Sequence, residues 1–183
     1  ILEPTTTAWL HQPDFDPSQK ESLDRLGTEF FELLMSLERA QVPYDLGSEN
    51  ILARMGAAHD GSLRVGRAAY TTLVIPPSTE NLNAKTIDLL NAFVASGGAL
   101  IACGEPPPLV DGQPSDAAAI LSKSRGWQRA QPSDLPGLLS TRCQTPLAIR
   151  RAPGDPGVLF HHRRHLDDGE LLFLINTSLQ DAS

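Results

Sequence analysis

The sequence predicts an α/β fold in which helices cover a mostly parallel sheet. Short apolar runs rich in β-branched residues alternate with two amphipathic segments, and Gly97-Gly98 ends the second of these. Continuous apolar strands of this kind are typical of sheets that are buried on both faces. With 183 residues, of which 40% are hydrophobic and 20% charged, the chain is long enough to bury such a core.

The helices are predicted from spacing and capping. Residues 16–40 begin with a capping aspartate and a proline at the first helical position, and apolar residues follow at intervals of three and four. Residues 84–96 follow a capping asparagine and end at Gly97-Gly98, which suits a left-handed cap. Shorter helices are expected at residues 48–55, 116–123 and 134–141.

The predicted strands of the sheet are the apolar runs at residues 42–46, 71–75 and 99–103. Ile1-Leu2 is expected to end a first strand. We expect the three runs to be parallel and the helix at residues 16–40 to pack against them. The helix residues expected to make this contact are Leu26, Phe30 and Leu33.

Residues 158–165 and 171–177 are predicted to form a C-terminal β-hairpin. Asp-Gly between apolar runs is a strong hairpin signal, and we expect a positive φ at Gly169. The second strand is apolar on both faces, so we expect the domain's own sheet to cover one face and a neighbouring β module or subunit the other. The predicted division is an α/β domain at residues 1–153 and a hairpin segment at residues 154–183.

Charge and hydropathy exclude several classes of function. The net charge is −7 and no basic stripe is visible, so we predict no nucleic-acid binding. The longest apolar runs are far below the roughly 20 residues that span a bilayer, so no membrane segment is predicted. The chain has no initiator methionine or signal segment, and we expect it to be a piece of a larger protein, with its compartment left open.

Two cysteines, Cys103 and Cys143, are too few for a disulfide framework. Cys103 ends a predicted strand, where a nucleophile elbow would stand in an α/β sheet. An elbow needs small residues on both sides, and Ile101 occupies one of these positions. A buried, unreactive thiol is therefore favoured, with a cysteine-dependent enzyme using Cys103 as an alternative.

Neither a metal nor a cofactor is predicted. On a strand, His161 and His162 point to opposite faces and His161 and His165 lie about 13 Å apart, whereas zinc ligands converge within about 2.1 Å of the ion. The hydroxyl-rich residues 5–7 are similar to the phosphate loop of flavodoxins but lack its glycine. A flavodoxin-like small-molecule-binding domain is the second alternative.

The acidic residues near strand ends are more informative. Ligands of open α/β sheets bind outside the carboxyl ends of the strands. The candidates for a carbohydrate rim are Trp9, as a sugar-stacking face, and Asp45, Glu49 and Glu105, together with Glu3, as acceptors of hydrogen bonds from hydroxyl groups. Helix capping and solvation is nevertheless the favoured interpretation of these acidic residues, and it suits Glu49 in the first turn of a short helix. No residue is assigned a catalytic role.

Several sequence segments resemble parts of a known kind of domain. They are residues 42–45 with 49–52, residues 70–77, residues 93–101 and the ending at residues 164–178. In this order they resemble the α/β domain that follows the catalytic barrel in large microbial glycoside hydrolases. The nearest types are α-L-rhamnosidase-like enzymes and β-galactosidases with a trimerisation domain.

This resemblance implies a flavodoxin-like, class I glutamine-amidotransferase-like three-layer fold. The amidotransferase Cys-His-Glu triad is not matched, and the family's catalytic carboxylates belong to the barrel. We therefore expect a non-catalytic accessory domain of an enzyme acting on α-L-rhamnosides or β-galactosides. The partners implied are the barrel and β modules of the same protein, a possible second copy of the chain, and carbohydrate at the rim.

Overall fold

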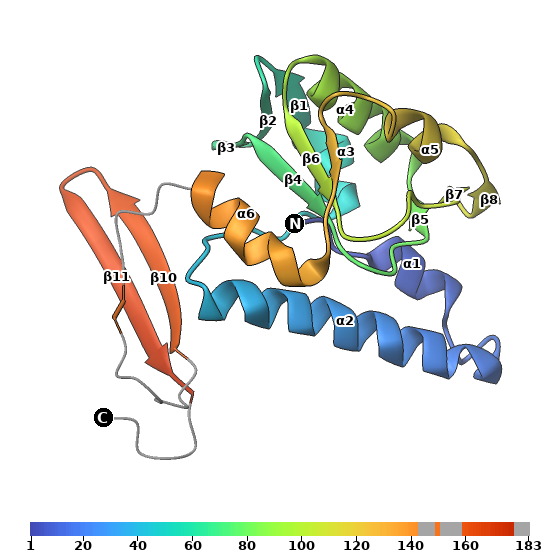
Figure 1. Ribbon diagram of the computed structural model, residues 1–183, viewed down its shortest axis with the longest axis horizontal. Helices are drawn as coiled ribbons and strands as arrows, with labels where there is room; N and C mark the ends of the chain where they lie inside the picture. Colours follow the sequence, from blue (N-terminus) through green and yellow to red (C-terminus); the bar gives the residue numbers. More distant parts are fainter. Residues whose placement is uncertain (143–148, 151–158, 178–183) are drawn as a thin grey trace. The chain divides into compact units, whose positions relative to one another are not determined.

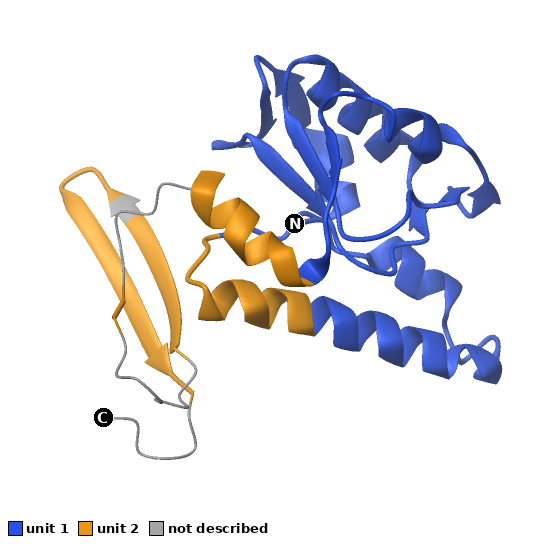
Figure 2. Ribbon diagram, viewed as in Figure 1, with its two compact units in different colours: residues 1–31, 44–132 blue, residues 32–43, 133–183 orange. Residues whose placement is uncertain are grey.

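Figure 1 shows the computed structural model of the chain, which describes residues 1–142, 149–150 and 159–177. The chain forms two compact units (Figure 2). Unit 1 comprises residues 1–31 and 44–132, and unit 2 comprises residues 32–43 and 133–183. The predicted boundary between residues 153 and 154 lies outside the described residues and stays a prediction.

Unit 1 contains a parallel sheet. Its strands are β4 (Thr72–Ile75), β6 (Ala99–Ala102) and β9 (Trp127–Arg129), in the order β4-β6-β9. Three consecutive residues are buried in β4 and in β6, so both faces of these strands are covered. The predicted strands at residues 71–75 and 99–103, and their parallel pairing, are confirmed, whereas β9 is not predicted from the sequence.

Leu2 extends this sheet by a single bridge. Its N–H donates to the carbonyl oxygen of Val74 in β4 (2.9 Å), and Leu2 also forms an isolated parallel bridge with Gly47. Leu2 is almost fully buried. The expected first strand at Ile1-Leu2 is thus reduced to one pairing on each side of Leu2.

The predicted strand at residues 42–46 is wrong. The N–H of Val42 donates to the carbonyl oxygen of Leu37 (3.0 Å), which closes the preceding helix, and Gln41 has a positive φ of 57°. Pro43 has no N–H to donate to a ladder. Two consecutive donors are therefore lost. The backbone of the segment is joined to the sheet through the carbonyl oxygen of Asp45, which accepts from the amino group of Ile1 (2.8 Å), and through the bridge at Gly47.

The helix predicted at residues 16–40 is present as a 3-10 turn, η1 (Pro17–Gln19), followed by α2 (Lys20–Arg39). Asp16 caps the turn, because its Oδ1 accepts from the N–H of Ser18 (3.0 Å). Leu26 is buried in unit 1 and Phe30 is half-buried. Leu33 belongs to unit 2 and is buried there.

The other helices of unit 1 follow the predicted pattern except for α1 (Thr5–Leu10), which is not predicted from the sequence. Those predicted are α3 (Glu49–Met55), α4 (Ala84–Ala95) and α5 (Ala117–Leu121). The end of α4 requires glycine twice. Gly97 has φ 102°, and a Cβ on Gly98 would lie 2.1 Å from the ring of Phe93.

Two small sheets of unit 1 are not predicted from the sequence. One is an antiparallel meander of β1 (Gly56–His59), β2 (Ser62–Val65) and β3 (Ala68–Tyr70). The other joins β5 (Asn81–Leu82), β7 (Leu109–Val110) and β8 (Gln113–Pro114). Each contains a tight Asp-Gly turn, Asp60-Gly61 and Asp111-Gly112, in which both residues have positive φ.

The core of unit 1 is a continuous cluster of apolar side chains from the parallel sheet, its bridging residue and the surrounding helices and strands. Its buried members are Leu2, Leu52, Leu63, Leu73, Ile75, Leu82, Ile87, Leu90, Phe93, Leu100, Ala102, Ala118 and Leu121. Phe93, Leu90 and Leu100 have no exposed surface. The helix α4 and strands β4 and β6 are therefore fixed by burial, which positions the loops that follow them.

Unit 2 contains the last part of α2, α6 (Leu135–Arg142) and a hairpin. It also contains the last two residues of the 3-10 turn η2 (Pro132–Asp134), because the unit resumes at Ser133. The helix predicted at residues 134–141 is confirmed as α6. The side-chain amide of Gln41 donates to the carbonyl oxygen of Ile149 (2.9 Å), and its Oε1 accepts from the N–H of Ile149 (2.8 Å). Buried apolar side chains of this unit are Leu33, Leu37, Val42, Leu135 and Leu139.

The hairpin consists of β10 (Leu159–Leu166) and β11 (Gly169–Asn176), which pair antiparallel. The predicted hairpin is confirmed for its described residues, whereas residue 158 lies outside them. The expected positive φ at Gly169 is wrong. The connecting turn is Asp167-Asp168, and Gly169 already pairs with Leu166 as the first residue of β11.

Candidate functional site

The candidate site is the set of loops at the carboxyl ends of the parallel strands. Glu49 follows the bridge at Gly47, residues 76–79 follow β4, and Gly104-Glu105 follow β6. Trp9 lies on α1, which follows Leu2. Of the four predicted rim residues, Trp9, Glu49 and Glu105 therefore come after strands or bridges at this end, and Asp45 does not.

Asp45 lies at the amino end of the sheet. Its Oδ2 accepts a hydrogen bond from the hydroxyl of Tyr70 (2.7 Å), and Tyr70 precedes β4. Burial raises the pKa of Tyr70 to about 12, with the hydrogen bond to Asp45 as the second cause. The expected place of Asp45 at the carboxyl rim is thus wrong, because residues 42–46 form no strand and Asp45 precedes the bridge at Gly47.

Glu49 is the most deeply placed of the four, with 4% of its surface exposed. Its Oε1 accepts from the hydroxyl of Thr6 (2.6 Å), and its Oε2 accepts from the N–H of Asn83 (2.7 Å). Charge-assisted hydrogen bonds of this kind offset the cost of burying a carboxylate. Glu49 thereby ties α1 and the start of α4 to α3, and both of its oxygens have partners within the chain.

The hydroxyls of residues 5–7 are used in the same way. Thr7 is fully buried, and its Oγ1 accepts from the N–H groups of Glu80 and Asn81, both at 3.0 Å. Thr6 donates to Glu49. This segment is the first part of α1 and not a phosphate-type loop. The hydroxyl of Thr6 joins α1 to α3, and the hydroxyl of Thr7 joins α1 to residues 80 and 81 at the start of β5.

Trp9 and Glu105 are exposed. Trp9 has 74% of its surface accessible. Glu105 forms an ion pair with Arg129, the last residue of β9. Both partners of the pair are largely exposed, and such surface pairs contribute about 0–1 kcal/mol. Among the described residues, no hydrogen bond or ion pair joins Trp9 to Glu105.

Cys103 is buried directly after β6. Its N–H donates to the carbonyl oxygen of Ile75 (2.9 Å), which continues the pairing with β4. Burial raises the pKa of the thiol to about 11. The thiol is therefore protonated at neutral pH, while a cysteine nucleophile acts as the thiolate. Cys143, the other cysteine, lies outside the described residues.

Two polar contacts at this end are not predictable from the sequence. Ser78 has a positive φ of 55° and donates from its hydroxyl to Glu29. His11 places Nδ1 2.7 Å from Oε1 of Gln19 and Nε2 3.1 Å from Oε2 of Glu80. Because the hydroxyl of Ser78 donates to a carboxylate and not to a histidine, these residues do not form the Ser-His pair of a nucleophilic site.

The described part of the chain holds no group of three His, Cys, Asp or Glu side chains that could bind a metal ion. The register of the hairpin places His161 opposite Leu174 and His162 opposite Phe173, so these two histidines lie on opposite faces. None of the helices in the described ranges is both long and apolar enough to cross a membrane.

Comparisons of the chain with protein-family models, with curated proteins and with solved structures find no match.

Proposed function

We propose that this chain is a non-catalytic accessory domain of a glycoside hydrolase that acts on α-L-rhamnosides or β-galactosides. The observation that carries the proposal is the use of polar groups at the carboxyl end of the sheet. Glu49, Thr6 and Thr7 are bonded within the fold, and Cys103 is a buried thiol. Side chains engaged in this way hold segments together and are not available to a substrate.

Glycoside hydrolysis places further demands on a site. It uses two carboxyl groups that flank the scissile bond, about 5–10 Å apart. Of the predicted rim carboxylates, Glu49 is enclosed, Asp45 lies at the other end of the sheet and Glu105 is in an ion pair. Two other carboxylates described at this end, Glu29 and Glu80, contact Ser78 and His11. The catalytic carboxylates of the proposed enzyme would therefore come from its barrel, as the resemblance implies.

The order of the sheet supports the finer description of the fold. If Gly47 and Leu2 are counted as vestigial strands, the order is Gly47, Leu2, β4, β6, β9. When the five are numbered by their order in the sequence, their spatial order in the sheet is 2-1-3-4-5, which is the order of flavodoxin-like folds. We therefore propose the three-layer, flavodoxin-like and class I amidotransferase-like arrangement for the α/β part.

Trp9 and Glu105 retain a proposed role at the rim. An exposed indole is suited to stacking on the apolar face of a sugar ring, and an exposed carboxylate accepts hydrogen bonds from hydroxyl groups. The hairpin supports a packing role, because large apolar side chains are exposed along β11. Its proposed neighbours are the barrel and β modules of the same protein.

A hydrolysis assay tests the absence of catalysis. We expect the purified chain to give no turnover of aryl α-L-rhamnosides or aryl β-galactosides. Turnover that disappears in Glu105→Ala would overturn the proposal. Turnover that is equal in the wild type and in Glu105→Ala would exclude Glu105 as its source, because this exposed substitution leaves the fold intact.

Tryptophan fluorescence tests the rim. The chain has two tryptophans, and Trp127→Phe leaves Trp9 as the sole emitter. We expect L-rhamnose or galactose to change its emission in a saturable way, and the matched variant Trp9→Phe to show no response. An unchanged emission in Trp127→Phe would remove carbohydrate from the proposed function while leaving the packing role in place.

A further inference from the structure

The hairpin exposes apolar side chains on both of its faces. Leu171, Phe173 and Ile175 share one face of β11, and Leu172 and Leu174 share the other. Between 40% and 56% of the surface of each of these five residues is accessible. A two-stranded hairpin is at best marginally stable in water, so this strand requires a further neighbour.

The two edges of the hairpin differ in charge. Five consecutive residues of β10, residues 161–165, are histidine or arginine. Basic residues at an edge oppose pairing with a second copy of themselves. The outer edge of β11 from Leu171 to Ile175 has no charged side chain and, within the described ranges, no ladder partner. It is therefore the edge at which another strand can add.

The order of residues in β11 identifies the strand that fits. In a two-fold symmetric antiparallel pair centred on Phe173, this residue lies opposite itself. Leu171 then faces Ile175 of the other copy, and Leu172 faces Leu174. Every one of the five residues thus meets an apolar residue on the same face.

Other symmetric registers are worse. Moving the centre to Leu172 places Glu170 opposite Leu174, and moving it to Leu174 places Asn176 opposite Leu172. Each shift sets a polar side chain against an apolar one, and register is strongly specified where such mismatches arise. We propose that β11 pairs antiparallel with β11 of a second copy of this chain, with Phe173 on the two-fold axis. This inference depends on β11 alone and goes beyond the proposed function.

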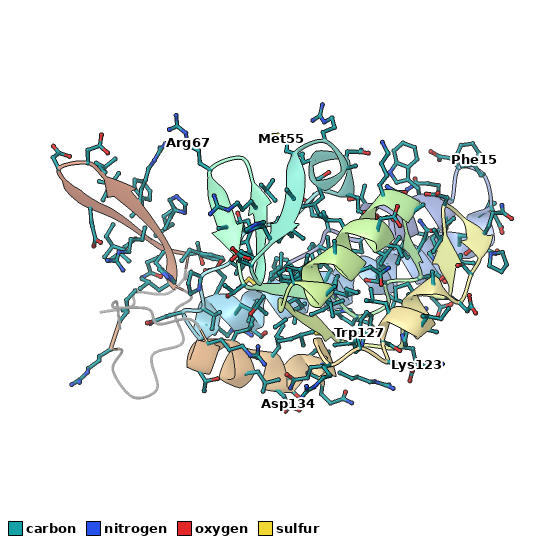
Figure 3. The ribbon with its side chains drawn as sticks, turned by 90° about the horizontal axis from the view of Figure 1, so that it is seen from above. Phe15, Met55, Arg67, Lys123, Trp127 and Asp134 are labelled. Carbon is teal, nitrogen blue, oxygen red and sulfur yellow. The ribbon has the colours of Figure 1, made fainter. Side chains whose placement is uncertain are left out.

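Charge substitution at the axis tests the pairing. Phe173→Lys and Phe173→Asp each place two like charges face to face, and we expect each to raise the dimer dissociation constant more than about tenfold. An equimolar mixture of the two variants pairs Lys with Asp and should restore the dimer. Analytical ultracentrifugation over a dilution series measures all three. Phe15→Lys is the matched control, because Phe15 is 90% exposed in unit 1 and projects from the ribbon there (Figure 3).

The expected pattern is a dimer for the wild type and Phe15→Lys, monomers for the two single variants, and a dimer for their mixture. A monomeric wild type, or a dimer that survives in both Phe173 variants, would overturn the proposal. Circular dichroism of each variant checks that unit 1 remains folded. Its core contains none of the substituted residues.

Cross-linking gives a second measurement that does not depend on charge. Phe173→Cys places two cysteines directly opposite each other, within reach of a disulfide. Leu171→Cys does not, because its neighbour in the other copy is Ile175. We expect Phe173→Cys to form a covalent dimer under mild oxidation and Leu171→Cys to form none. Equal cross-linking of the two variants would contradict the register.

Discussion

Strand β6 and strand β11 are both continuous apolar runs, yet their surroundings differ. In β6, Leu100, Ile101 and Ala102 have no exposed surface, and the strand lies between β4 and β9. In β11, every residue is exposed, and among the described residues only its edge toward β10 is paired. An apolar run therefore predicts a strand, but it does not specify what covers the strand. The described part of the chain buries the central strands of the sheet in unit 1 and leaves β11 exposed.

The largest expected difference in stability is between one substitution in β6 and one in β11. Leu100→Ala removes a fully buried side chain and should lower the free energy of unfolding by about 2–5 kcal/mol. Leu174→Ala, on exposed β11, should lower it by less than about 1 kcal/mol. Urea denaturation at low protein concentration measures both. Equal losses would mean that β11 is buried as deeply as β6.

Glycine substitutions test the same difference between the two regions at their turns. Gly98→Ala places a Cβ within 2.1 Å of the Phe93 ring and should cost about 1–3 kcal/mol. Nothing lies within 4 Å of the corresponding position at Gly169, whose φ is not positive, so Gly169→Ala should change stability by less than about 0.5 kcal/mol. Thermal unfolding of the two variants gives this difference directly. A destabilised Gly169→Ala would indicate a positive φ at Gly169 and would contradict the structure of this turn.

The carboxylates of Glu49 and Glu105 should also differ in how much they contribute to stability. Glu49→Gln removes the charge from both hydrogen bonds and leaves a single side-chain oxygen to accept from the N–H of Asn83 or the hydroxyl of Thr6, and should cost about 1–3 kcal/mol. Glu105→Gln removes only an exposed ion pair and should cost at most about 1 kcal/mol. Denaturant midpoints measure both changes. A neutral Glu49→Gln would argue against a structural role for this carboxylate.

Alkaline pH should act on unit 1, which contains both groups with a raised pKa. The pKa of Cys103 is raised from 9.0 to about 11, and that of Tyr70 from 10.0 to about 12. A raised pKa in the folded state contributes stability below the unfolded value, and this stability is lost as pH rises through the folded value. We therefore expect stability to fall between about pH 9 and pH 12, and to fall less in Tyr70→Phe. A profile that is flat over this range would contradict these shifts.

The elements that could be predicted are those with local signals. The Gly97-Gly98 stop, the spacing of α4 and the apolar runs of β4 and β6 all lie within short windows. The pairs Asp60-Gly61 and Asp111-Gly112 carry a hairpin signal as clear as that of Asp168-Gly169. They were missed because the strands beside them are short and only partly apolar, while Asp168-Gly169 lies beside a long apolar run.

The candidate site was less predictable because it depends on contacts between distant segments. Glu49 meets Thr6 and Asn83 across 43 and 34 residues of sequence. His11 meets Glu80 and Ser78 meets Glu29 without any local pattern. The error at Asp45 has a single cause. The apolar run at residues 42–46 predicts a strand, but Pro43 has no N–H and the N–H of Val42 bonds to the carbonyl oxygen of Leu37.

Amide hydrogen exchange of the wild-type chain tests the contrast between the two regions most directly. At low protein concentration, we expect amides of β6 to exchange only through global unfolding and amides of β11 to exchange at least about a hundredfold faster. Raising the concentration should slow exchange in β11 alone, as its edge pairs with a second copy. Protection of β11 equal to that of β6 at low concentration would show that this strand is already covered within one chain, and would contradict the account.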